Sequence, residues 1–255
     1  MNFVGKSLAL SSTGFSDAVL ALNTKAAEVW SVLAVETRGS GFLSDRRPKI
    51  LFERHIFSRL TNRQFDASHP DISSSSPGGY GAGGSHQYDR LLAASALNEE
   101  AALKSASWGL AQIMGENFDK AGFDNVEDMV QAMISSEDAQ MAAFSAFLLS
   151  QKLDRALAIH DWATFARGYN GSNFAKNHYD TQLNGFFNKF AVGPLPDLDV
   201  RMAQVYLMFQ GFDPHGIDGV MGPGTQSALI QFQQSAQLPA TGLPDVATLA
   251  KLAPS

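Results

Sequence analysis

Residues 36–42 read Glu36-Thr37-Arg38-Gly39-Ser40-Gly41-Phe42 and follow directly on an apolar pattern of helical period. Trp30, Leu33 and Ala34 recur at i, i+3 and i+4, which predicts a helix over 26–36. A carboxylate at the C-terminal end of a helix meets the negative end of the macrodipole, and partial burial desolvates it. Both effects predict a raised pKa for Glu36, so that it can donate a proton to a glycosidic oxygen near neutral pH. The two glycines allow close approach of backbone or ligand.

Composition bounds the class of protein. The chain has 255 residues, enough for one large and one small domain. A net charge of −6 argues against a nucleic-acid binder, and the lack of cysteine excludes disulfides and thiolate chemistry. No segment is apolar for long enough to span a bilayer, and the patch Leu8-Ala9-Leu10 is too short for a signal-peptide core. We therefore expect synthesis in the cytoplasm, with release or dedicated export if the protein works outside the cell.

Proline and glycine cluster between two periodic regions, which predicts a linker over 191–198. It separates a large domain, 1–190, from a small module, 199–255. The large domain is expected to be mainly helical, with helices over 16–22, 26–36, 99–107, 127–134, 137–153 and 161–166, and with 50–52 as a short strand or helix start. The module is expected to hold three helices, over 200–210, 225–237 and 245–252, with Thr225 and Asp245 as N-caps and no internal repeat.

A stretch rich in serine and glycine, residues 73–84, is incompatible with regular structure. We interpret it as a mobile loop near a binding site with Tyr80 at its tip, or else as a plain surface loop.

Two further segments of the large domain carry polar groups suited to a sugar. In 107–114, Gly109 is expected to let a helix start pack tightly and Gln112 to offer an amide to a sugar hydroxyl or a water. In 166–171, Tyr169 and Asn170 stand at a predicted helix end between two glycines, which points a phenol and an amide into a cleft. The alternative for each segment is a purely structural role, with Tyr169 buried and its hydroxyl bonded.

Taken in order, these segments resemble the lysozyme-like superfamily of goose-type lysozymes and soluble lytic transglycosylases, and most closely the N-acetylmuramidase domain family of bacteria and phages. The residues that carry the resemblance are Pro48-Lys49-Ile50-Leu51-Phe52-Glu53-Arg54-His55, Pro77-Gly78-Gly79-Tyr80, Tyr88-Asp89-Arg90-Leu91, Ser105-Ala106-Ser107-Trp108-Gly109, Gln112-Ile113-Met114-Gly115 and Phe165-Ala166-Arg167-Gly168-Tyr169-Asn170-Gly171. The resemblance implies an α-rich lysozyme-like fold and cleavage of the β-1,4 bond between N-acetylmuramic acid and N-acetylglucosamine. Thr37-Arg38 departs from the small residues usual in relatives. Because a nearby guanidinium favours an ionised carboxylate, we predict that the Arg38 side chain points away from Glu36.

The small module resembles the three-helix peptidoglycan-binding domain. The residues that carry this match are Val200, Gln204, Leu207, Gly211, Asp218-Gly219, Gly222, Thr225, Ala228, Phe232-Gln233, Leu238, Gly242, Thr248 and Leu252. Such modules tether a catalytic domain to its polymer and raise its effective concentration there. A degenerate interaction module is the alternative.

The sequence does not decide which residue supplies the second catalytic group. Asp45, flanked by Arg46 and Arg47, is the first candidate for a base or nucleophile, and Glu53, expected to pair with Arg54, is the second. If neither reaches the site, the substrate's own 6-hydroxyl can attack, as in a lytic transglycosylase. The chain has six histidines: His55, His69, His86, His160, His178 and His215. No two of them stand at i and i+4 with a carboxylate between, as in a helical zinc site, so we expect no metal and no cofactor.

These observations predict a two-domain peptidoglycan hydrolase of the endolysin type. Its expected partner is the glycan strand of bacterial peptidoglycan, and the chain is expected to act as a monomer. The rival interpretations are a lytic transglycosylase and a non-catalytic wall-binding or phage-apparatus component.

Overall fold

The computed structural model describes residues 1–36, 39–171 and 178–254, and it is mainly helical, as predicted. The helices and strands, in chain order, are α1 (Ser12–Ala21), α2 (Ala26–Glu36), β1 (Ile50–Phe52), α3 (Arg54–Leu60), α4 (His86–Ser95), α5 (Glu99–Lys104), β2 (Ala106–Trp108), β3 (Ile113–Met114), the 3-10 turn η1 (Gly115–Asn117), α6 (Val126–Ser135), α7 (Glu137–Ser150), α8 (Asp154–Ala158), α9 (Trp162–Asn170), α10 (Tyr179–Val192), α11 (Leu198–Phe209), α12 (Pro223–Ser235) and α13 (Val246–Leu252).

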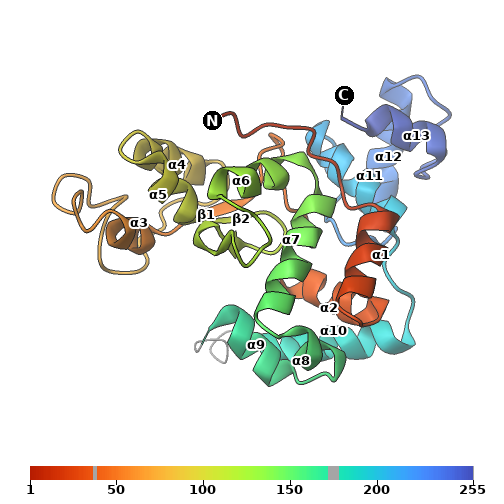
Figure 1. Cartoon of the computed structure of the whole chain (residues 1–255). Coiled ribbons are helices and arrows are strands. Elements are labelled where there is room, and N and C mark those ends of the chain that lie inside the picture. Colours follow the sequence, from red (N-terminus) through yellow and green to blue (C-terminus); the bar gives the residue numbers. More distant parts are fainter. Residues whose placement is uncertain (37–38, 172–177, 255) are drawn as a thin grey trace.

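Figure 1 shows how these elements are arranged. The helix α7 runs through the middle of the molecule; α3, α4 and α5 form an arm on one side, and α8, α9 and α10 lie at the base. The last three helices, α11 to α13, sit together at the C-terminal end of the chain. Within the described residues no single helix has the length and apolarity to cross a membrane, although α1 and α2 together pass that test as a pair bent by 107°.

Local capping explains several of the helix starts. The helix α2 has the predicted bounds. Ser136 begins α7 by accepting a hydrogen bond from the Ala139 amide, and Asp161 and Asp245 cap α9 and α13 as the sequence predicted. Thr225, in contrast, is not an N-cap. Gly222 occupies that position and Pro223 follows in the first turn, which leaves Thr225 buried inside α12.

The predicted helix over 99–107 is wrong at its C-terminal end. The helix α5 stops at Lys104, and Ala106–Trp108 forms the central strand of an antiparallel sheet of order β1-β2-β3. Gly109 therefore starts no helix; it has φ +69° and opens the turn between β2 and β3. Ala106–Trp108 is a strand because it pairs with Ile50–Phe52, and residues 50–52 are therefore a strand and not a helix start.

The ends of other helices also differ from the predictions. The helix α9 continues through Gly168 to Asn170, and this glycine lies inside the helix against Leu153, where an added Cβ would come within 2.4 Å of the leucine side chain. Four helices, α3, α4, α8 and α10, were not predicted. The helix α1 starts at Ser12, and α7 ends at Ser150.

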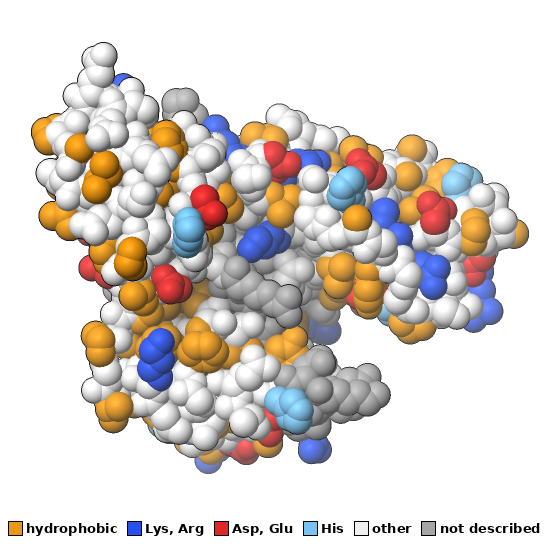
Figure 2. All heavy atoms as spheres, turned by 180° about the vertical axis from the view of Figure 1, so that it is seen from behind, with side chains coloured by type: hydrophobic (Ala, Val, Ile, Leu, Met, Phe, Trp, Pro, Cys, Tyr) orange, Lys and Arg blue, Asp and Glu red, His pale blue; other side chains and the backbone are white. Residues whose placement is uncertain are grey.

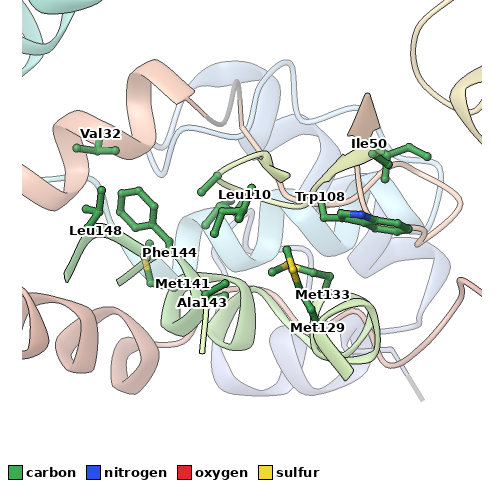
Figure 3. Close-up of a cluster of buried hydrophobic side chains, with 14 of the residues drawn as sticks. Val32, Ile50, Trp108, Leu110, Met129, Met133, Met141, Ala143, Phe144 and Leu148 are labelled. Carbon is green, nitrogen blue, oxygen red and sulfur yellow. The ribbon is translucent and has the colours of Figure 1, made fainter. Parts of the chain in front are cut away.

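The main hydrophobic core gathers around α7 (Figure 3). Phe144 and Leu148 from α7 face Val32 of α2, while Trp108 of β2 lies near Met129 and Met133 of α6. Trp108 is fully buried, and its Nε1 donates to the Leu103 carbonyl at 3.0 Å. The sheet and α2 are thus fastened to the same core.

A second hydrophobic cluster is formed by α11, α12 and α13 together with Ala9. Contrary to the prediction, this region contains an internal repeat. Gln204 and Gln233 make equivalent hydrogen bonds. Each side chain accepts from a glycine amide, Gly219 or Gly242, and donates to the buried hydroxyl of the threonine six positions after that glycine, Thr225 or Thr248. Both glycines have positive φ, +72° and +68°, which the tight turn requires.

Candidate active site

Three segments that the sequence singled out meet at the backbone of Lys49. Its amide donates to the Gly41 carbonyl, and its carbonyl accepts from the Gly109 amide, both at 2.8 Å. The Gln112 side chain donates to the same Lys49 carbonyl at 3.1 Å. The segment after Glu36, the turn between β2 and β3, and the strand β1 are therefore joined into one frame.

The close approach predicted for the glycines after Glu36 is observed at Gly41, and Gly39 in addition has an unusual backbone conformation. Gly39 has φ +112°, a conformation that side chains disfavour. Gly41 lies so close to α7 that an added Cβ would stand 2.0 Å from Gln140 Oε1 and 2.9 Å from the Leu110 amide nitrogen. Gln140 fixes this contact, since it accepts from the Leu110 amide and donates to the Met133 carbonyl, both at 2.7 Å.

Glu36 itself is the last residue of α2. Its side chain, and all of Thr37 and Arg38, lie outside the described residues. The raised pKa of Glu36 and the orientation of Arg38 therefore stay predictions.

Asp45 lies in the turn between Leu43 and Arg47 and forms an ion pair with Arg47. Its Oδ2 accepts from Arg47 Nε at 2.9 Å and from Nη2 at 2.6 Å, and its Oδ1 accepts from the Arg47 amide. Burial acts to raise the pKa of Asp45, but the hydrogen bonds and charge of Arg47 outweigh it, so the pKa is lowered. Arg46 instead donates to the Gly5 and Lys6 carbonyls. Asp45 is thus a carboxylate held ionised by a single neighbour.

Glu53 follows β1 directly and is mostly buried, with 15% of its side chain exposed. The expected pairing with Arg54 is wrong: the Arg54 guanidinium packs on Gly79 and donates to the Pro70 carbonyl. Glu53 Oε2 lies 3.1 Å from His55 Nδ1, but neither atom is aligned for a hydrogen bond. Burial raises the pKa of the Tyr80 phenol, and the charge of Glu53 and a hydrogen bond to it raise it further. The tip of the 73–84 loop therefore lies against Glu53.

That loop has no regular structure, as predicted, and it is fastened at several points. Gln87 donates to the Tyr80 and Ala82 carbonyls, and its own Oε1 accepts from the Phe52 amide at 3.0 Å. Arg90 donates to the Gly79 carbonyl at 2.9 Å. The sequence reasoning missed both residues, although the match Tyr88-Asp89-Arg90-Leu91 includes one of them.

The amide of Gln112 is engaged inside the protein. Its Nε2 donates to Lys49 and Gly109 carbonyls and its Oε1 accepts from Ser107 Oγ at 2.8 Å. Both amide hydrogens are therefore used to hold the turn, and only the carbonyl oxygen retains capacity toward a ligand. Its role in substrate binding stays a prediction.

Tyr169 is half-buried near the end of α9. Its hydroxyl donates to the Ala111 carbonyl in the turn between β2 and β3. Its ring stacks on Phe165 and meets Phe144 and Phe147 edge-on. Tyr169 therefore ties α9 to the frame around Lys49. Asn170 ends α9, and its side chain lies outside the described residues.

Figure 2 shows the molecule hollowed between the arm of α3, α4 and α5 and the lobe of α8, α9 and α10. Over the part of the chain that the structure describes, no three His, Cys, Asp or Glu side chains group as metal ligands.

Comparison with known proteins gives the family. Residues 25–191 match the family model described as N-acetylmuramidase, and residues 196–252 match a putative peptidoglycan binding domain. The crystal structure of the Burkholderia AP3 phage endolysin is similar to this chain, with 39% identity and a TM-score of 0.67 over 72% of this chain and 71% of the endolysin. No curated protein sequence matches the chain. The match over 25–191 means that this chain belongs to the N-acetylmuramidase family of glycoside hydrolases.

Proposed function

We propose that this protein is an endolysin-like muramidase that cleaves the β-1,4 bond between N-acetylmuramic acid and N-acetylglucosamine, with Glu36 as general acid. The observation that carries the proposal is the frame around Lys49, which joins the segment after Glu36 to the turn of Gln112. A carboxyl group at the end of α2, five positions before a residue bonded to this frame, is suited to protonate the leaving oxygen. Positive charge then develops on the anomeric carbon of the muramic acid.

The second carboxylate is Asp45 or Glu53, and their surroundings support Glu53. Asp45 already accepts three hydrogen bonds from Arg47, so acting as a base or nucleophile requires breaking this pair. Glu53 keeps one buried oxygen without a hydrogen bond and lies beside Tyr80, an aromatic side chain suited to stack on a sugar. The distance from either carboxylate to Glu36 decides between inversion and retention.

We also propose the roles of the remaining site residues and of the two regions. Tyr80 and Asn170 contact sugar, while Gln112 and Tyr169 act mainly by holding the turn between β2 and β3. Residues 1–190 form the catalytic domain, 191–198 the linker and 199–255 the wall-binding module, which binds glycan strands. The protein acts as a monomer, without metal or nucleic acid, on a wall that it reaches after release or dedicated export.

Mass spectrometry of muropeptides released from purified sacculi tests the proposal. Reducing N-acetylmuramic acid ends are expected from the wild type and from Asp45→Asn, whereas Glu36→Gln and Glu53→Gln are expected to release almost none. Ends in 1,6-anhydromuramic acid would instead identify a lytic transglycosylase. Equal release by the wild type and Glu36→Gln would remove Glu36 from the mechanism, and no release by either would favour a non-catalytic wall-binding protein.

A further inference from the structure

A buried ion pair connects the wall-binding module to the catalytic domain. Arg201 of α11 is 2% exposed and Glu137 of α7 is fully buried. Arg201 Nη1 lies 2.5 Å from Glu137 Oε2, and Nη2 lies 3.0 Å from Oε1. The ion pair is therefore bidentate, and this geometry fixes the orientation of both side chains as well as the distance between them.

The same two side chains hold the segment after Glu36. Glu137 Oε1 accepts from the Gly41 amide at 2.7 Å and from Ser40 Oγ at 3.1 Å. Arg201 Nη2 donates to the Gly39 carbonyl at 2.7 Å. Three consecutive residues, beginning three positions after Glu36, are therefore bonded to this pair.

The same segment also packs against the module. Gly39 packs against Ile217 of the module, where an added Cβ would be 3.1 Å from the isoleucine Cβ. A pocket of about 320 Å³ remains between α2, α10 and the module, lined in part by Trp30, Gly39 and Arg201. The polar contacts of Arg201 therefore act beside the apolar contacts of Ile217 with Gly39 and of Phe209 with Phe42 in joining the module to this segment.

We propose that Arg201 is a positioning residue of the muramidase: through Glu137 and the Gly39 carbonyl it holds the backbone of residues 39–41 in place. The C-terminal module then completes the catalytic domain in addition to tethering it to the wall. This inference rests on the proposed role of Glu36. A catalytic group displaced by about 1 Å can lose about 100-fold in rate, so loss of this support acts on kcat rather than on binding.

The test uses the full chain and a soluble peptidoglycan tetrasaccharide, which is too short to benefit from wall tethering. Arg201→Lys keeps the charge but cannot reach Glu137 with two nitrogens and the Gly39 carbonyl at once. We expect kcat per folded molecule, measured well below Tm, to fall about 10- to 100-fold, with KM within about threefold. Pelleting with sacculi should show unchanged wall binding.

Two further variants make the test specific. Ser40→Ala removes a hydrogen bond to Glu137 within the segment itself, and it is expected to lower kcat in the same direction; it carries the test if the lysine variant folds poorly. Tyr206→Phe is the matched control. It removes another bond between the module and the catalytic domain, from the Ala9 amide to the tyrosine hydroxyl, without touching residues 39–41, and it should keep the wild-type kcat.

The outcomes separate this inference from the proposed function. Wild-type kcat in both Arg201→Lys and Ser40→Ala, or a loss seen on sacculi but not on the tetrasaccharide, would overturn the positioning role alone. A kcat loss in Tyr206→Phe equal to that in Arg201→Lys would also overturn it, because any weakening of the interface would then suffice. A Glu36→Gln protein as active as the wild type would overturn the proposed function, and the positioning role with it.

Discussion

Replacing Glu137 by glutamine is the sharpest test of how the structure is held together. Five donors converge on this carboxylate: both Arg201 terminal nitrogens, the Gly41 and Leu10 amides and Ser40 Oγ. Glutamine is nearly isosteric, but its amide nitrogen replaces one of the two oxygens. Each oxygen accepts at least two of these bonds, so in either orientation the new amide points hydrogens at donors.

The magnitude follows from burial. Arg201 and Glu137 are both within 2% of complete burial, and the variant leaves the guanidinium without a counter-charge. Removing one partner of such a pair costs about 3–5 kcal/mol. At about 2–4 °C per kcal/mol for a chain of this size, we expect Tm to fall by about 6–20 °C.

The deficit should depend on pH in a definite direction. Burial acts to raise the pKa of Glu137, but the charge and hydrogen bonds of Arg201 and the Gly41 and Leu10 amides lower it below its usual 4.5. The unfolded chain then binds more protons in the acid range, so the stabilisation is present above pH 4.5 and is lost as the pH falls through the folded-state pKa. The variant has nothing to titrate, and its deficit should shrink below pH 4.5.

Urea unfolding of both proteins from pH 3 to pH 8 measures this. Glu100→Gln is the matched control, since Glu100 pairs with Lys104 at 2.5 Å but is 64% exposed, and it should cost less than about 1 kcal/mol. A deficit in Glu137→Gln no larger than that of the control, or one that grows on acidification, would refute the reasoning.

Four further substitutions follow from the described contacts. Gly41→Ala should cost about 1–3 kcal/mol in urea unfolding and lower the rate on sacculi, because its Cβ would stand 2.0 Å from Gln140 Oε1. Tyr169→Phe loses the bond to the turn between β2 and β3 but keeps its aromatic contacts, so we expect about 1 kcal/mol of destabilisation and a reduced kcat. Gln233→Leu removes the acceptor of the buried Gly242 amide and the donor to two threonine hydroxyls and the Leu243 carbonyl; sacculus pelleting should show weaker wall binding. Gly185→Ala, exposed within α10 with nothing within 4 Å, should raise stability by about 0.5–1 kcal/mol.

Local signals predicted the parts of the fold that local chemistry decides. The bounds of α2 follow from an apolar period that stops at a glutamate and two glycines, and Asp161 and Asp245 cap their helices as expected. The close approach at Gly41 was likewise predicted from the sequence, whereas the positive φ of Gly39 was not.

Pairing between distant segments decided what local signals did not. The run after Glu99 has good helix formers, yet it turns into a strand at Ala106 because Ile50–Phe52 offers an antiparallel partner. The repeat in the module was hidden because its two copies have different spacings: the glycine lies 15 residues after Gln204 but 9 after Gln233. Only the hydrogen bonds show the equivalence.

The candidate site divides in the same way. The residue types and their order indicated which segments meet, and the frame around Lys49 brings them together. The roles of single side chains were less accessible. Gln112 looked like a ligand group, but its amide hydrogens are engaged by carbonyls, one of which belongs to Lys49, 63 positions away. Which hydrogen-bonding groups of a side chain stay available to a ligand depends on its neighbours in space, and the sequence does not give these.

Glu137 joins segments that are far apart in the sequence, and this affects the order in which they fold. The segments that contact it are the N-terminal stretch at Leu10, the residues after Glu36, the start of α7 and the helix α11. Leu8 also pairs with Ser136 beside it, and Ala9 packs into the cluster of the module. Residues 8–10 precede the stretch that matches the muramidase family, yet they contribute to the same buried centre as Arg201. Because the hydrogen bonds of Glu137 span 64 to 127 positions, the centre can close only when both ends of the chain are in place, which favours late formation after the core around α7. Residues 39–41 are then among the last parts of the catalytic domain to become fixed, and removal or displacement of the wall-binding module should disturb this segment first.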